Sequence, residues 1–270
     1  MIDTHKLERK ARWLRKSILL TAKRTGGKGA HLGGTMSCIE ILIALYYSDF
    51  LNIKPHDPNW KSRDRVLIGK GHAHLALYHI WSDIGYFKKE KIDEYGINGG
   101  SLGVQLDNRL PGSEYNTGSL GHVIGIGAGI CLSSRIDANK FKVITLIGDG
   151  ECESGSIWES VLFAGEQNLN NMLAIIDMNR LSEFKIRDDR SDYDLQNKFL
   201  SYGWNSRIVN GHSFEELINA FHGLKRSSKP LSIIANTIKG KGVSFMENNV
   251  EWHHKAPTPE QFEIALKEYE

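Results

Sequence analysis

Residues 142–159, KVITLIGDGECESGSIWE, decide the fold class of this chain. Residues 141–147 are rich in Val and Ile and predict a buried strand, the GDG that follows is a tight turn, and residues 155–168 predict a helix. The next apolar run, residues 172–177, predicts a second strand that ends just before Asn179. A strand, a helix and a second strand in this order form the unit from which parallel sheets are built.

Further strands and helices alternate on both sides of this unit. Short apolar runs predict strands at 65–68, 206–209 and 231–235, and helical periodicity predicts helices at 5–24, 37–46 (with Ser37 as N-cap), 72–84, 119–134, 194–202 and 213–224. Segments 26–35, 96–117 and 179–193 lack periodicity and are predicted to be loops. Alternation implies right-handed crossovers, so we expect an α/β fold with a doubly wound, mostly parallel sheet and helices on both faces.

The chain has no linker or internal repeat, which predicts a single domain over residues 1–270. Within it, residues 236–270 are expected to form a loop and a terminal helix that starts near Pro259.

The composition excludes several classes of protein. The 34 Lys and Arg residues are interspersed with 32 Asp and Glu residues, so no basic face for nucleic acid is expected. The three widely spaced cysteines, Cys38, Cys131 and Cys152, predict free thiols in a reducing compartment. The N-terminal segment lacks the apolar core of a signal peptide, and the longest apolar run, 120–132, is too short to span a membrane. We expect a soluble, cytoplasmic protein with no nucleic-acid or membrane partner.

Two polar residues follow neighbouring strands of the predicted sheet. Asp149 ends one strand between two glycines, and Asn179 ends the next. Their side chains should meet at the same sheet edge, beside the positive end of the helix that follows Asp149, where a metal diphosphate would fit. Carboxylate, amide and carbonyl oxygens, with phosphate oxygens and a water, would complete the octahedral shell of Mg²⁺. A lone GDG is more often an ordinary turn, but its spacing to Asn179 favours the metal site.

Together with four further segments, GDG and Asn179 resemble the thiamine diphosphate signature of the transketolase family. The segments are GAHLG around His31, SRDRVLIGKGH ending at His72, LPGSEYNTGSLG at 110–121, and KGKGVSFMENNVEWHHKAP at 239–257. They occur in the family's order, and the resemblance covers essentially the whole chain. It is a resemblance to the N-terminal, diphosphate-binding half of the family.

The resemblance implies that thiamine diphosphate and Mg²⁺, or Ca²⁺ or Mn²⁺ in its place, are the cofactors. It also implies an activity, the transfer of a two-carbon ketol unit from a ketose to an aldose, either of them free or phosphorylated. The implied roles are metal ligation by Asp149, Asn179 and the Leu181 carbonyl, cofactor contacts from His72, Gly118, Leu120, Asp149, Gly150 and Asn179, and proton handling by His31 and His253. The remaining loop or isolated histidines, His5, His56, His79, His212 and His222, are predicted to be surface residues.

Members of this family carry three domains, and this chain matches the first. The resemblance therefore implies a separate C-terminal subunit that supplies the pyrimidine-binding domain and the glutamate that activates the cofactor. We expect an assembly of two copies of each chain, with the cofactor bound between them.

Two positions depart from the family pattern. Val104 stands where a histidine contacts the donor sugar, and Gln105 or His122 would have to compensate. Ser154 occupies the position of a subunit-contact glutamate, with Glu153 one residue earlier, whereas Glu159 matches the family's second glutamate.

These departures keep two alternatives open. One is a thiamine diphosphate carboligase that uses a 2-keto acid donor and a sugar aldehyde acceptor, and the other is a non-catalytic, transketolase-like scaffold subunit. Two unrelated interpretations fit the residues less well. The glycines between 121 and 129 precede a strand, whereas a dinucleotide-binding fingerprint follows one, and His72, His74 and Cys152 do not complete a zinc site.

Overall fold

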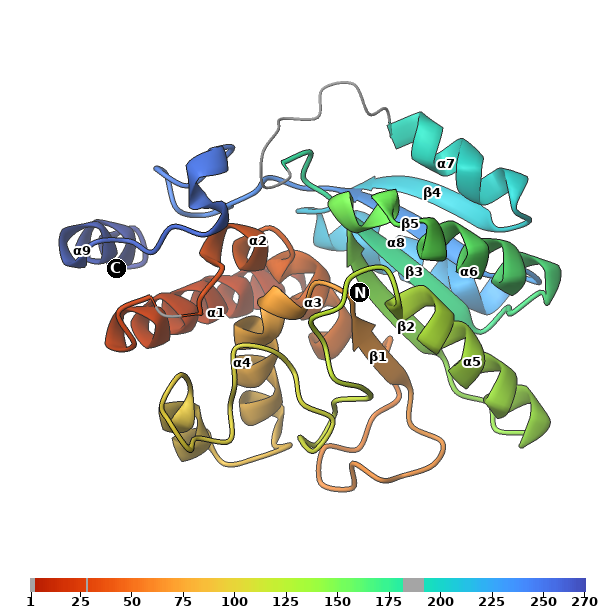
Figure 1. The fold of residues 1–270 in the computed structure, drawn as a ribbon, viewed down its shortest axis with the longest axis horizontal. Helices are drawn as coiled ribbons and strands as arrows, with labels where there is room; N and C mark the ends of the chain where they lie inside the picture. The colour runs from red at the N-terminus through yellow and green to blue at the C-terminus, as the bar shows by residue number, and fades with distance from the viewer. Residues whose placement is uncertain (1–2, 28, 182–191) are drawn as a thin grey trace.

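The computed structural model describes residues 3–27, 29–181 and 192–270, and its centre is a parallel sheet (Figure 1). The sheet has five strands in the order β1-β2-β3-β5-β4. The strands are β1 (Arg65–Ile68), β2 (Val143–Gly148), β3 (Met172–Met178), β4 (Asn205–Asn210) and β5 (Leu231–Asn236). Val143 lies opposite Met172, and Leu173 lies opposite Leu231, in parallel register. The predicted α/β parallel sheet is confirmed.

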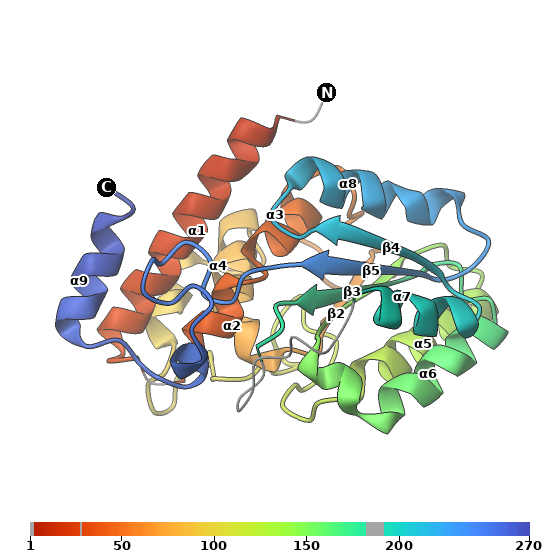
Figure 2. The same ribbon diagram turned by 90° about the horizontal axis from the view of Figure 1, so that it is seen from above.

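Helices cover both faces of the sheet (Figure 2). One face is covered by α5 (Val123–Ile136), α6 (Gly155–Glu166) and α7 (Asp192–Ser201), and the other by α3 (Ile39–Tyr47) and α8 (Phe214–His222). The chain advances along the sheet from β1 to β4 and then reverses direction to reach β5. Because each crossover is right-handed, a reversal of direction moves the connecting helix to the other face, so α8 lies on the opposite face from α6 and α7.

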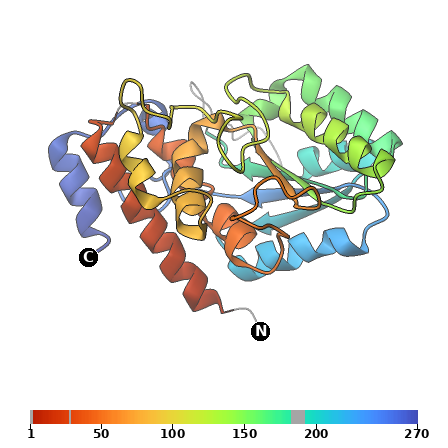
Figure 3. The same ribbon diagram turned by 90° about the horizontal axis from the view of Figure 1, so that it is seen from below.

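The strands supply two apolar cores through alternating side chains. In β2, Ile144 and Leu146 belong to one core, whereas Val143 and Ile147 belong to the other. The first core continues into α1 (Thr4–Arg24) and α4 (His74–Ile84). Figure 3 shows α1 beside α9 (Pro259–Lys267), away from the sheet. The burial of both sheet faces explains why these strands are continuously apolar.

The predicted start of the second helix is wrong. Residues 32–35, expected to lie in a loop, form with Met36 the short helix α2 (Leu32–Met36), and Cys38 rather than Ser37 is the N-cap of α3. The Ser37 hydroxyl is instead used in tertiary contacts, since it donates to Asp177 at 2.6 Å and to the Gly34 carbonyl at 3.1 Å.

Smaller differences also have local causes. Helix α5 begins at Val123 rather than near 119, because Gly121 has a φ of +86°, outside the helical region. Short 3₁₀ turns at 71–73, 89–94, 150–153, 223–226 and 250–253 were not expected. Residues 182–191 of the predicted polar loop lie outside the described residues.

For two of the five histidines predicted to lie on the surface, His79 and His212, the prediction is wrong. His79 is 9% exposed and shares a hydrogen bond of 3.0 Å with Thr21, and the ring of His212 is bonded on both sides. His5 and His56 are exposed, whereas His222 is half-buried against Phe50. The three cysteines are thiols, as expected, and all three are buried. Among the described helices, none combines the length and apolarity that crossing a bilayer requires.

Polar residues gather at the carboxyl edge of the sheet. Asp149 follows β2, Asn179 follows β3, and Thr237 follows β5. The chain after β5 passes α2 on its way to α9 (Figure 2). The carboxyl edge of an open parallel sheet is the usual place of a ligand site.

Candidate active site

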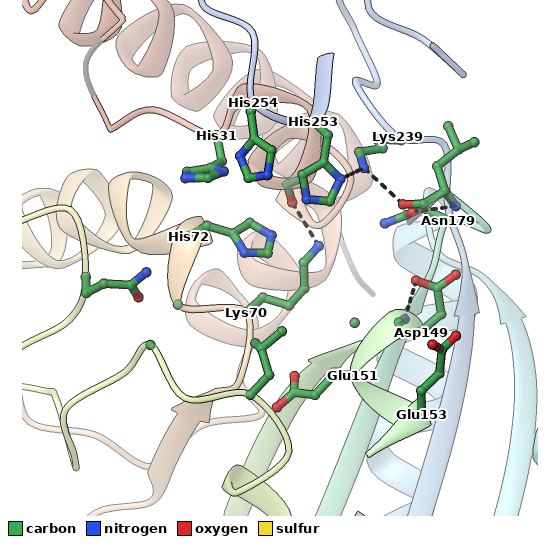
Figure 4. Close-up of a pocket in the computed structure, with 18 residues that line it drawn as sticks. His31, Lys70, His72, Asp149, Glu151, Glu153, Asn179, Lys239, His253 and His254 are labelled. Carbon is green, nitrogen blue, oxygen red and sulfur yellow. Dashed lines mark hydrogen bonds between the residues drawn. The ribbon is translucent and has the colours of Figure 1, made fainter. Parts of the chain in front are cut away.

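A cavity of about 360 Å³ opens at this edge (Figure 4). Its lining includes every residue to which the resemblance assigns a cofactor, metal or proton-handling role, namely His31, His72, Gly118, Leu120, Asp149, Gly150, Asn179, Leu181 and His253. They come from separate parts of the chain, so the fold brings together what the sequence separates.

Oxygen donors line one side of the cavity. Asp149 is 4% exposed, and its carboxylate accepts from the backbone N–H groups of Gly150 at 2.9 Å and Arg180 at 2.8 Å. Asn179 Oδ1 accepts from Leu181 N–H at 3.1 Å. These contacts fix the Asp149 carboxylate and the Asn179 amide oxygen, and Leu181, bonded to Asn179, also lines the cavity.

This donor set fits a hard divalent cation. Burial, and then repulsion by Asp177, raise the pKa of Asp149, so the carboxylate lies where a bound cation would stabilise its charged form. In the part of the chain that the structure describes, no three His, Cys, Asp or Glu side chains form a metal cluster. One carboxylate, one amide and one carbonyl would leave positions for phosphate oxygens and water, which is how Mg²⁺ is usually held.

The zinc interpretation is not supported. His74 is buried, its ring contacts the Gly71 carbonyl at 2.9 Å and the Tyr95 hydroxyl at 3.1 Å, and burial lowers its pKa to about 4. Cys152 Sγ contacts the Gly148 carbonyl. His74 and Cys152 therefore serve the structure of the two turns that carry them.

The dinucleotide interpretation is also not supported. The glycines in question lie within or just before α5, which precedes β2. A Cβ at Gly127 would lie 2.9 Å from the Thr145 side chain and 3.1 Å from that of Met172. Close packing of a helix on the sheet explains this glycine.

Four imidazole rings line the opposite side of the cavity (Figure 4). The ring centroids of His31 and His72 are 5.5 Å apart, and those of His72 and His253 are 6.4 Å apart. His254 lies 4.8 Å from His31 and 4.6 Å from His253. Burial and the charge of Lys70 lower the pKa of His72 well below its usual value, so this ring is neutral at pH 7.

Lys239 fixes the orientation of His253. Its Nζ donates to the Leu181 carbonyl at 2.9 Å and to His253 Nδ1 at 2.5 Å. Burial and the Lys239 charge lower the pKa of His253 to about 4. Because Nδ1 accepts, the neutral ring carries its proton on Nε2 and can donate it to a bound oxygen.

A second lysine joins the segments around the cavity. Lys70 is 3% exposed and donates to the Gly34 carbonyl at 2.8 Å, to the Ser37 hydroxyl at 3.2 Å and to the carboxylate of Asp177. Asp177 is fully buried and also accepts from Thr237. Burial would lower the pKa of Lys70, but Asp177 outweighs it and raises this pKa, so both groups are charged.

Sequence reasoning missed Lys70, Glu151, Lys239 and His254 as lining residues. The two lysines lie inside the quoted segments: Lys70 stands between two glycines in GKG, and Lys239 begins KGKG. Glu151 Oε1 accepts from Gly121 N–H at 2.9 Å, and burial raises the pKa of this residue to about 7.

Among the positions involved in the departures from the family pattern, some line the cavity and others lie outside it. Gln105 lines the cavity, and its Oε1 accepts from Thr117 at 2.8 Å. Val104 and His122 do not line the cavity, and Val104 is 46% exposed. Ser154 lies at the start of α6, outside the cavity lining, whereas Glu153 is part of it.

The fold and this cavity correspond to a known class of domain. The family model described as "Transketolase, thiamine diphosphate binding domain" matches residues 15–268. The chain therefore belongs to the transketolase family and corresponds to its N-terminal, thiamine diphosphate binding part. It is one subunit of a transketolase-type transferase.

Similar proteins include subunits of about the same length. One subunit of the apulose-4-phosphate transketolase of Phocaeicola vulgatus is 36% identical over 243 residues, which cover 89% of this chain and 86% of that protein. One subunit of the 6-deoxy-6-sulfo-D-fructose transketolase of Clostridium sp. is 35% identical over 98% of this chain and 96% of its own length. Human transketolase is 33% identical over 89% of this chain, which corresponds to 38% of the longer protein.

Solved transketolases have the same fold. The transketolase of Leishmania mexicana superposes with a TM-score of 0.83 over 92% of this chain and 38% of its own, at 23% identity. A Pichia stipitis transketolase variant gives a TM-score of 0.84 over 96% of this chain and 40% of its own, at 22% identity.

Proposed function

We propose that this chain is a single-domain subunit that binds thiamine diphosphate through Mg²⁺ and transfers a two-carbon ketol unit between sugars. The observation that carries the proposal is the cavity with two unlike walls, buried oxygen donors around Asp149 on one side and imidazoles, among them the neutral His72 and His253, on the other. The bond between C2 and C3 of a ketose would break, and the two-carbon unit would join the aldehyde carbon of an aldose. When bound, thiamine diphosphate supplies the nucleophilic carbon and the electron sink for this chemistry.

The residues of this chain would hold the diphosphate and manage protons. Asp149, Asn179 and the Leu181 carbonyl would bind the metal, with Mg²⁺ as the expected ion and Ca²⁺ or Mn²⁺ able to replace it. His72, Gly118, Leu120 and Gly150 would contact the cofactor. His253, with its proton on Nε2, would donate to a substrate oxygen as negative charge develops, and His31 would exchange protons at the neighbouring oxygen.

The partner would be a C-terminal transketolase subunit with the pyrimidine-binding domain and a glutamate that activates the cofactor. Relatives of about the same length are themselves described as subunits, which supports a divided enzyme. We propose a heterotetramer of two copies of each chain, with the cofactor between unlike subunits. The buried thiols support the proposal that the enzyme works in the cytoplasm.

The test is to co-express the chain with that partner and to identify products by mass. Xylulose 5-phosphate plus ribose 5-phosphate, with thiamine diphosphate and Mg²⁺, should give sedoheptulose 7-phosphate if ordinary sugar phosphates are substrates. Apulose 4-phosphate and 6-deoxy-6-sulfo-D-fructose should be assayed as donors as well, because the names of two relatives contain these sugars. Release of carbon dioxide from pyruvate, with every ketose left unchanged, would refute ketol transfer and support the carboligase alternative.

A substitution separates a catalytic subunit from a scaffold. Asp149→Asn keeps the volume of the side chain but removes the charge that would bind the metal, so cofactor binding by the complex should fall at least about tenfold while the fold persists. The exposed Asp57→Asn is the matched control. Unchanged Mg²⁺-dependent binding in Asp149→Asn, measured by titration calorimetry, would show that the metal site lies elsewhere.

A further inference from the structure

The segment after β5 brings two cavity residues into place. Lys239, on this segment, is 2% exposed and bonds both the Leu181 carbonyl and His253 (Figure 4). The backbone of the segment is also attached to α2, because Gly240 N–H donates to the Gly33 carbonyl at 2.9 Å. The position of residues 238–241 therefore sets where the Lys239 amine and the His253 ring lie in the cavity.

His212 holds this segment from outside the cavity. Ile238 N–H donates to His212 Nε2 at 2.8 Å, next to Lys239 in sequence. A nitrogen that accepts is unprotonated, so the other ring nitrogen, Nδ1, carries the proton and donates it to Glu40 Oε2 at 2.9 Å. The ring is thus a neutral bridge between α3 and the backbone of the segment.

Glu40 and Arg15 complete the bridge. Glu40 is 7% exposed, and Arg15 reaches its two carboxylate oxygens at 2.7 and 2.9 Å. Burial alone would raise the pKa of Glu40, but His212 and Arg15 outweigh it and hold the pKa at about 2. Arg15 Nε also donates to the Lys241 carbonyl at 2.9 Å. The three hydrogen-bonded side chains Arg15, Glu40 and His212, here called the relay, therefore bind the segment at residues 238 and 241, on either side of Lys239.

We propose that His212 is a positioning residue for the cofactor and substrate cavity, acting through Ile238 to place Lys239 and His253. None of the three relay side chains lines the cavity, so the relay acts only through the backbone it holds. The proposal rests on the proposed function for its ligand, thiamine diphosphate with Mg²⁺. Without the hydrogen bond to Ile238, Lys239 would be held less firmly, and Lys239 orients His253. Cofactor binding and turnover should therefore weaken together.

Two substitutions at His212 separate positioning from folding stability. The amide oxygen of Gln can occupy the place of Nε2 and accept from Ile238, whereas the shorter Asn can keep only the Glu40 bond. Both variants leave the Arg15–Glu40 ion pair in place. The exposed His56→Gln is the control.

Two measurements on the complex with its partner subunit test the idea. In His212→Asn, hydrogen exchange at the Ile238 amide should accelerate at least about tenfold, and half-saturation by thiamine diphosphate should rise about five- to tenfold, as expected for the loss of one partly buried hydrogen bond. His212→Gln should stay within about threefold of the wild type in both. Equal effects of Asn and Gln, or unchanged exchange at Ile238 in His212→Asn, would overturn the proposal.

Failure of the proposed function would be visible separately. A wild-type complex that does not bind thiamine diphosphate at all refutes the proposed function and, with it, the ligand of this inference. A wild-type complex that binds, with variants that lose only thermal stability and keep the wild-type half-saturation, refutes the positioning role alone.

Discussion

Replacement of Lys70 by Met should destabilise the chain strongly. Met keeps the aliphatic length of the side chain but removes the ammonium, which donates to Gly34, Ser37 and Asp177. The Asp177 carboxylate, 0% exposed, would then lack its counter-charge. The perturbation therefore tests whether this buried pair is charged and joins the turn before α4 to the end of β3.

The magnitude follows from what remains around Asp177. Loss of one partner of a buried ion pair typically costs about 3–5 kcal/mol, because the other charge stays buried. Asp177 keeps its bonds from Ser37 and Thr237, so the lower end applies, about 3 kcal/mol. With a urea slope of about 3 kcal/mol/M, the unfolding midpoint should fall by about 1 M.

The assay is urea unfolding of the full chain, followed by near-UV circular dichroism. Lys225→Met, at an exposed lysine, is the control and should change the free energy of unfolding by less than about 0.5 kcal/mol. The double variant Lys70→Met with Asp177→Asn removes both charges and should recover most of the loss. The reasoning fails if Lys70→Met matches Lys225→Met, or if the double variant is no better than Lys70→Met.

Three further predictions concern packing, pH and the donor. Gly165→Ala should lose about 1–3 kcal/mol in urea unfolding, because the new Cβ would lie 1.8 Å from a backbone oxygen, whereas Gly129→Ala, with no atom within 4 Å, should not lose stability. The pKa of Glu40 is about 2 in the folded chain and 4.5 in the unfolded chain, so its contribution to the free energy of unfolding is present above pH 4.5 and is lost as the pH falls toward 2. In Glu40→Gln the free energy of unfolding should therefore change by about 3 kcal/mol less over that pH window than in the wild type. Gln105→Leu should raise the donor KM about tenfold, while Val104→Ala, outside the cavity, should stay within about twofold. If the free energy of unfolding of Glu40→Gln still fell steeply below pH 4.5, the second prediction would be wrong. Equal donor KM values for Gln105→Leu and Val104→Ala would contradict the third.

The sheet could be predicted from sequence because its central strands are buried on both faces. Such strands are continuous Val and Ile runs, and the GDG turn marks where β2 ends. Helix α2 could not be predicted, because Gly33 and Gly34 look like loop residues. A Cβ at Gly33 would lie 2.6 Å from the Trp252 carbonyl, and one at Gly34 would lie 2.6 Å from His72 Nε2. These glycines serve close approach between distant segments, and no local pattern records that.

The candidate site divides in the same way. The residues in family motifs could be located from sequence, because each motif is local. Lys70 lies inside one of these motifs, but its pairing with Asp177, 107 residues away, is visible only in the fold. His212 lies in none of them, and its role depends on Ile238, 26 residues away. A lone histidine is usually a surface residue, and only the fold shows that His212 bridges the buried Glu40 and the Ile238 backbone.

The two walls of the cavity explain why both kinds of group are needed. Lys70 and Lys239 lie close to the imidazoles, and their charges help to hold His72 and His253 neutral. A neutral ring can donate from one nitrogen while accepting at the other, so His253 can stabilise a developing oxyanion at neutral pH without first gaining a proton. The buried Asp149 has the opposite need, because burial raises its pKa and a bound cation would stabilise its charged form. The fixed charges of the two lysines would also attract an anionic diphosphate, so the same groups that keep the rings neutral favour binding of the metal diphosphate as a whole.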